Sequence, residues 1–159
     1  MANSFWYGKA AQRLFKATGE LDFDDPTAGL YKILLTKGTG YTPNSATDDF
    51  VSVIGANESD ATGYTGGFGG SGRKALDNRA VNLISGKVIF DNTVDPTWNP
   101  IGGTTNNTLQ WGIVHKVVTN DAASILILAL DVSAVTTNGG SFTATFADGA
   151  TLGIGYIGY

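Results

Sequence analysis

The chain of 159 residues contains no cysteine and a single histidine, His115. The first absence excludes disulfide bonds, thiolate metal sites and a cysteine nucleophile. A single histidine excludes a zinc site built on several histidines. A catalytic triad would need His115 together with partners from distant segments. We therefore predict a packed or edge-exposed histidine, and we predict no metal and no cofactor.

Basic clusters and long apolar runs are also missing. The net charge is −4 and the pI is about 4.7, and no Lys/Arg stripe could follow a phosphate backbone, so nucleic acid is not an expected partner. No window reaches the ~18 uncharged apolar residues of a membrane span. The first residues lack a secretory pattern because Lys9, Arg13 and Lys16 interrupt it. We expect no membrane partner and synthesis in a cytoplasm.

The last part of the chain carries no positive charge. Residues 117–159 contain no Lys, Arg or His, and they end in the apolar sequence Thr-Leu-Gly-Ile-Gly-Tyr-Ile-Gly-Tyr. An end this apolar is not expected to remain in water. We predict a strand there, buried in its own sheet or against another chain.

What the chain has in abundance is glycine, with 22 residues, while 42% of the sequence is still apolar. This combination indicates turn-rich β structure and argues against disorder. We predict one β-rich domain over residues 1–159, an antiparallel β-sandwich or jelly-roll-like fold with one or two short helices. In the second half of the chain we expect antiparallel meanders, because the connections there are too short for parallel crossovers.

Hydrophobic periodicity and turn residues place the elements. An N-terminal helical segment is predicted at about 4–18, with Ser4 as its cap and Gly19 after its end, and a shorter helix near 48–54. The predicted strands are 30–37, 80–84, 87–90, 109–118, 124–130, 142–146 and 151–157.

Two motifs invite a functional interpretation. Residues 67–72 match the dinucleotide pattern GxGxxG, but no core strand precedes them and no helix is expected after them, so we predict a surface loop. Asp22, Asp24 and Asp25 could hold a hard cation, although a solvated turn before Pro26 is favoured because EF-hand features are missing.

No catalytic group set stands out, and we predict no enzyme. A hydrolase with scattered carboxylates is an alternative that requires a cleft lined by at least two acids.

The order of segments along nearly the whole chain resembles small virion structural proteins of tailed bacteriophages. The segments that carry the resemblance are the helical stretch 7–15, the acids at 22–25, the Lys-Ile-Leu-Leu strand at 32–35, Tyr41-Thr42-Pro43 with Asp48-Asp49-Phe50-Val51, the strand pair 80–90, the strand around Trp111, and residues 138–143. The resemblance implies a β-sandwich-like module that coats or cements an icosahedral capsid, often as a trimer, or a head-fibre or tail component. It carries no catalytic residues.

The function expected from this resemblance is capsid decoration. A decoration (cement) protein binds the outer surface of the head and bridges neighbouring capsid subunits, so the expected partners are the major capsid protein and further copies of this chain, with a homotrimer favoured. It would be made in the host cytoplasm and found in the virion. The alternatives are a head-fibre or tail/adaptor component, or a receptor- or glycan-binding β-sandwich that uses loops 63–72 and 93–108 with Trp98 as a stacking platform.

Candidate contacts follow from two apolar segments that are not expected to face water, namely the apolar end of the chain and the aromatic residues 5–7. Three consecutive aromatics cannot all lie on one face of a helix, so at least one of them is exposed unless something covers it. A subunit contact and packing on the chain's own sheet both satisfy this requirement. The possible subunit or capsid contacts are Phe5, Trp6, Tyr7, Ile154, Tyr156, Ile157 and Tyr159.

Overall fold

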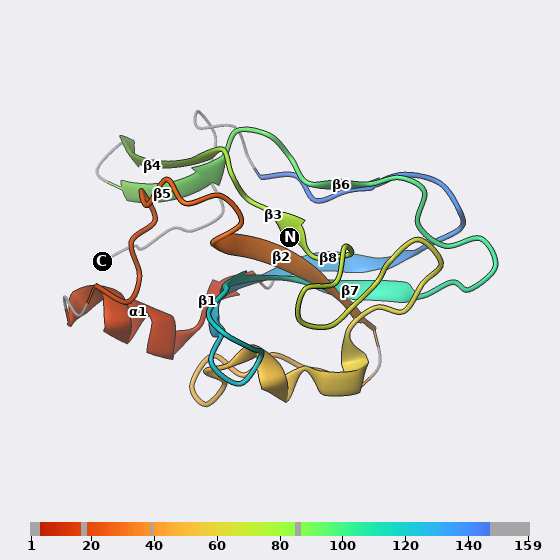
Figure 1. The fold of residues 1–159 in the computed structure, drawn as a ribbon, viewed down its shortest axis with the longest axis horizontal. Helices are drawn as coiled ribbons and strands as arrows, with labels where there is room; N and C mark the ends of the chain where they lie inside the picture. The colour runs from red at the N-terminus through yellow and green to blue at the C-terminus, as the bar shows by residue number, and fades with distance from the viewer. Residues whose placement is uncertain (1–3, 17–18, 39, 85–86, 147–159) are drawn as a thin grey trace.

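The computed structural model describes residues 4–16, 19–38, 40–84 and 87–146 (Figure 1). Within these ranges its elements, in chain order, are β1 (Phe5–Trp6), α1 (Gly8–Phe15), β2 (Tyr31–Lys37), the 3₁₀ turns η1 (Val51–Val53) and η2 (Gly55–Asn57), β3 (Lys74–Ala75), β4 (Arg79–Ile84), β5 (Lys87–Asn92), β6 (Thr97–Trp98), β7 (Thr108–Lys116), β8 (Ile125–Thr136) and β9 (Phe142–Thr143).

The central sheet has five antiparallel strands in the order β1-β8-β7-β2-β3. β7 lies in the middle, and its Ile113 is opposite Leu34 of β2 and Ala129 of β8. Successive side chains of a strand point to opposite faces, and both Ile113 and its neighbour Val114 are fully buried. Both faces of this sheet are therefore covered.

The covering layers are shown in Figure 1. The β4–β5 hairpin and β6 lie on one side of the central sheet, and the 3₁₀ turns lie on the other. β6 pairs with β9, so two small two-stranded sheets accompany the large one. The prediction of a mainly β, antiparallel, sandwich-like fold is confirmed.

Most predicted strands are present. The segments 30–37, 80–84, 87–90 and 109–118 correspond to β2, β4, β5 and β7, and the segment 124–130 is the first part of the longer β8. The predicted strand 142–146 is shorter, since β9 ends at Thr143. The predicted strand 151–157 lies outside the described residues.

The helical predictions were partly wrong. Phe5 and Trp6 form β1 against β8, and helix α1 begins only at Gly8. Ser4, predicted as the helix cap, instead accepts a hydrogen bond from a backbone N–H of β8 through its hydroxyl. Pairing with β8 overrides the local helical pattern because it satisfies the backbone and buries aromatic surface. The segment near 48–54 forms 3₁₀ turns, and residues 17–18 lie outside the described ranges.

Across the described ranges no helix combines the length and the apolarity that crossing a membrane would require.

The outer half of β8 contains a bulge. Ser133 and Ala134 have φ angles of 62° and 55°, and the pairing with β7 shifts register at this point. The Asp131 carboxylate accepts hydrogen bonds from the Ser133 N–H at 2.8 Å and from Gln110 Nε2 at 2.9 Å, which holds the bulge in place. A bulge interrupts the regular edge that an extended strand offers to another chain.

The bulge leads to a stability prediction. A non-glycine residue in the left-handed region costs about 1–2 kcal/mol, and glycine relieves this cost at the expense of a more flexible unfolded chain. Ala134→Gly is therefore expected to raise the free energy of unfolding by about 0.5–1 kcal/mol, as measured by urea denaturation. The matched control is Ala75→Gly in the exposed β3, which is expected to lower stability by a similar amount. Equal losses for both variants would contradict the strained backbone at Ala134.

Candidate functional site

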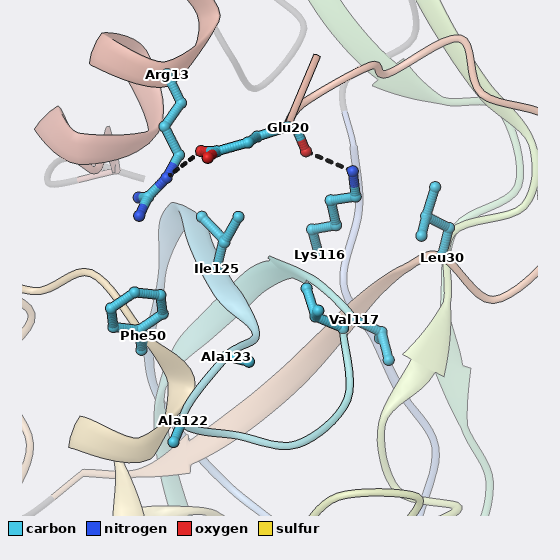
Figure 2. Close-up of a pocket in the computed structure, with 10 residues that line it drawn as sticks. Arg13, Glu20, Leu30, Phe50, Lys116, Val117, Ala122, Ala123 and Ile125 are labelled. Carbon is cyan, nitrogen blue, oxygen red and sulfur yellow. Dashed lines mark hydrogen bonds and ion pairs between the residues drawn. The ribbon is translucent and has the colours of Figure 1, made fainter. Parts of the chain in front are cut away.

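An open apolar pocket lies at one end of the central sheet, next to α1 (Figure 2). Its volume is about 680 Å³. The apolar lining residues are Leu30, Phe50, Val117, Val118, Ala122, Ala123 and Ile125, and the charged ones are Arg13, Glu20 and Lys116. These residues come from segments far apart in the sequence, so the fold alone creates the pocket.

Backbone hydrogen bonds place the pocket walls. The Val117 N–H donates to the Leu30 carbonyl at 2.8 Å and extends the β2–β7 pairing to the pocket. Phe50 forms an isolated bridge with Ile125, which attaches the segment before η1 to the start of β8. The Ser124 hydroxyl donates to the Asn120 carbonyl at 2.8 Å and closes the turn between β7 and β8.

Ion pairs form the charged rim. Arg13 makes a two-pronged contact with Asp49, and its Nε donates to Glu20 Oε2 at 2.8 Å. The guanidinium also lies over the Phe50 ring, 5.4 Å from its centroid. The hydrogen bond to Asp49 raises the pKa of Arg13, so the cation is retained at all physiological pH values. Lys116 Nζ donates to the Glu20 carbonyl, as Figure 2 shows.

The pocket is suited to binding. Its floor is aliphatic and aromatic, and the charged groups on its rim already have partners within the chain. Val118 is 44% exposed although it is apolar, which leaves part of the wall in contact with water. An exposed apolar hollow with a satisfied polar rim is typical of a surface that receives an apolar side chain.

A second, polar cleft of about 560 Å³ lies on the side of the sheet that carries the 3₁₀ turns. Glu58, Asp60 and Asp121 line it, so the convergence of acids that a hydrolase would require is present. Lys37 Nζ lies 2.9 Å from Asp60 Oδ2, and this hydrogen bond lowers the pKa of Asp60. Asp60 thus remains an ionised partner of Lys37 at neutral pH.

The other two acids converge on Arg73, whose side chain is almost completely buried. Its Nε and Nη2 donate to Glu58 at 2.8 and 2.7 Å, and its Nη1 and Nη2 donate to Asp121 at 2.6 and 2.9 Å. Glu58 also accepts hydrogen bonds from the Tyr64 hydroxyl and the Gly67 N–H, both at 2.9 Å. With four donors on Glu58, the hydrogen-bonding capacity of this carboxylate is occupied by groups of its own chain.

The glycine loop is a packing element. It is followed by β3 and not by a helix, so the context that a dinucleotide site requires is missing. A Cβ at Gly72 would lie 2.6 Å from the Tyr64 ring, and one at Gly70 would lie 2.2 Å from the Thr65 carbonyl oxygen. Glycine is present at these positions because the backbone approaches its neighbours too closely for a side chain.

The acidic turn and Trp98 also have structural roles. Asp22 and Asp25 accept hydrogen bonds from backbone N–H groups two residues later, at 3.1 and 2.9 Å, as expected for a solvated turn. Among the described residues no group of three or more metal-ligating side chains gathers. Trp98 is only 1% exposed, so the prediction that its ring is a sugar-stacking platform was wrong.

The N-terminal aromatics find cover within their own chain. Tyr7 is fully buried, and its hydroxyl lies 2.9 Å from that of Tyr41. Phe5 and Trp6 are half-buried and pack edge-to-face against Trp111 and Phe23. Of the two alternatives, packing on the chain's own sheet describes Tyr7, which has no surface left for a partner. The other predicted contacts, Ile154, Tyr156, Ile157 and Tyr159, lie outside the described residues.

The apolar pocket and the Arg73 cluster were not predicted from the sequence. The ten pocket residues show no spacing that would mark them as a group. The cluster had one weak signal, an arginine directly after a glycine run, but its two acids are 15 and 48 residues away from Arg73. Comparisons of the chain with protein-family models, with curated proteins and with solved structures found no match.

Proposed function

We propose that this chain is a structural protein of a tailed-bacteriophage virion, namely a capsid decoration protein that binds the outer surface of the head and bridges neighbouring capsid subunits. The segment order described above supports this proposal. So does the antiparallel sandwich-like fold, with both faces of its central sheet covered. A covered sheet of this kind is a stiff body through which contacts at its two ends can be linked.

The observation that carries the proposal is the apolar pocket beside α1. An apolar side chain of a capsid subunit that enters it would bury both itself and the exposed part of Val118. Full burial of one leucine- or phenylalanine-sized side chain contributes about 1.5–3 kcal/mol. A homotrimer would present three such pockets, and linked contacts multiply affinity without any new chemistry.

This function needs no reactive group. The pocket lining contains no histidine, serine, threonine or tyrosine, and its one carboxylate, that of Glu20, is hydrogen-bonded to Arg13. We propose a non-enzymatic role in the virion, with the major capsid protein and further copies of this chain as partners. Phe5, Trp6 and the apolar residues at 154–159 remain proposed contacts, whereas Tyr7 does not.

Immunogold electron microscopy of purified phage particles tests the location. Label over the head is the expected result. Label on the tail or fibres would transfer the proposal to the head-fibre, tail or receptor-binding alternatives. Unlabelled particles would overturn the proposal of a surface component of the virion.

A pocket variant tests the contact itself. Ala123→Arg places a long cation in the apolar pocket, and we expect its affinity for particles stripped of this protein to fall at least about tenfold, which corresponds to about 1.4 kcal/mol. Co-sedimentation with the particles measures this affinity. The matched control is Thr104→Arg, which adds the same charge to an exposed loop beyond the opposite end of β7. Equal affinity of both variants would show that the pocket is not the contact.

A further inference from the structure

The single histidine of the chain lies at the centre of the fold. His115 belongs to β7, the middle strand, and is fully buried. Its Nδ1 is 3.4 Å from the Ile113 carbonyl, and its Nε2 has no hydrogen-bond partner among the described residues. A buried polar atom without a partner is costly, and a buried charge costs much more. The fold therefore tolerates a neutral imidazole and opposes an imidazolium.

Charged groups from several neighbouring elements act on this imidazole. Arg73, at the end of the glycine loop, places a cation near it, while Glu58 and Asp121 contribute the opposing negative charges. On β2 the residue opposite His115 is Lys32, and on β8 it is the apolar Leu126. A second buried positive charge at His115 would thus compete with Arg73 for the same two carboxylates.

Those carboxylates hold one layer of the fold in place. Arg73 and Glu58 both belong to the covering segment (residues 57–73), so their ion pair braces this segment internally, whereas the ion pair of Arg73 with Asp121 attaches it to the turn between β7 and β8. Its Ser59 N–H donates to the Leu35 carbonyl at 2.9 Å, and its Tyr64 hydroxyl accepts from the Leu35 N–H at 3.1 Å. Movement of the Asp121 carboxylate away from Arg73 therefore weakens this attachment.

We propose that His115 is an acid-sensitive latch, and that proton uptake by its buried imidazole releases the covering segment from the central sheet. The proton comes from solvent, and the imidazolium then draws Asp121 away from Arg73. The device is independent of the proposed virion function, since all its parts lie within one chain.

The sign and the pH window follow from the environment of the histidine. Burial, together with the Arg73 cation, lowers the pKa of His115 from 6.5 to about 4. The released state takes up its proton below about pH 6.5, whereas the closed state does so only near pH 4. The closed state, with residues 57–73 attached to the sheet, is therefore fully favoured above pH 6.5. Its stability relative to the released state decreases as the pH falls from 6.5 to 4. The closing equilibrium weakens about 300-fold from well above pH 6.5 to well below pH 4, and about 80-fold between pH 6.5 and 4, because each state is half-protonated at its own pKa.

Two measurements on the purified full-length protein test the latch. Because His115 is the only histidine, its imidazole NMR signals titrate without overlap, and we expect a midpoint near pH 4. Hydrogen exchange followed by mass spectrometry, corrected for the intrinsic pH dependence of exchange, should show protection of residues 57–73 falling about 80-fold between pH 6.5 and 4.

Variants that cannot titrate separate the histidine from the carboxylates. His115→Leu fills the site with an apolar side chain, and His115→Gln keeps a neutral polar group in case the first variant folds poorly. In either variant we expect the loss of protection between pH 6.5 and 4 to shrink by at least tenfold. An imidazole that titrates near 6.5, or variants that lose protection as the unaltered chain does, would overturn the proposal.

Discussion

Arg73→Met is expected to lower the free energy of unfolding by about 3–5 kcal/mol, because it leaves two buried or half-buried carboxylates without their cation. The Arg73 side chain is 4% exposed, and the side chains of Glu58 and Asp121 are 8% and 29% exposed. Methionine has a similar length and fills the space of the aliphatic stem. The loss therefore measures the uncompensated charges and not a cavity. Urea denaturation at pH 7 with linear extrapolation provides the measurement.

A surface arginine provides the matched control. Arg13 also contacts two carboxylates, but its side chain is 19% exposed and one partner, Glu20, is 50% exposed. Arg13→Met is expected to cost about 1 kcal/mol, since solvent screens the charges that remain. In the double variant Arg73→Met/Glu58→Gln one stranded charge is removed, so part of the loss should be recovered. Equal costs for the two arginine variants would contradict the role of burial.

The strands in the middle of the sheet could be predicted because their signals are local. In β7 a run of alternating and apolar residues is long enough to indicate a strand without knowledge of its neighbours. In β8 the apolar run at 125–130 indicated a strand buried on both faces. β1 has only two residues, and its strand conformation depends on β8, more than 120 residues later in the chain. No local pattern in Phe5 and Trp6 could have predicted that pairing.

The same pairing explains why the helical premise of the exposure argument for the aromatics was wrong. The argument assumed a helix, on whose surface three consecutive side chains spread over a wide arc. In the extended backbone of β1 the side chains alternate, so Phe5 and Tyr7 lie on one side of the sheet and Trp6 on the other. The ring centroids of Phe5 and Tyr7 are 5.7 Å apart, and the Trp6 ring packs on Phe23. Tyr7 is thus fully covered within the chain, and Phe5 and Trp6 are partly covered.

The candidate sites depend on tertiary structure even more strongly. The sequence predicts a loop at the glycine run 63–72. It does not show why glycine is required there, because the close approach of Gly72 to the Tyr64 ring is a tertiary contact that sequence spacing does not encode. The acids Glu58 and Asp121 were known only as scattered carboxylates. Their convergence on Arg73 requires β2, the glycine loop and the turn before β8 to be in place at once. Sequence separation contains no information about such distances.

The second large effect is expected at Trp98, which links two parts of the fold. Its ring is 1% exposed and lies 5.7 Å from the Phe142 ring, and its Nε1 donates to the Gly72 carbonyl at 2.6 Å. The side chain therefore joins the β6–β9 pair to the end of the glycine loop. Trp98→Ala removes this contact and leaves a cavity, so we expect a loss of about 3–5 kcal/mol in the free energy of unfolding, measured by urea denaturation.

Trp98→Phe separates the hydrogen bond from the buried ring. It keeps an aromatic side chain beside Phe142 but leaves the Gly72 carbonyl without its donor, and we expect a loss of about 1–2 kcal/mol. This ordering also bears on the glycan-binding alternative. A ring that served only to stack on a sugar would be dispensable for folding, and both variants would then be as stable as the unaltered chain. A loss of stability in both variants would agree with the 1% exposure of Trp98 and would leave its ring a structural role and no role in sugar stacking.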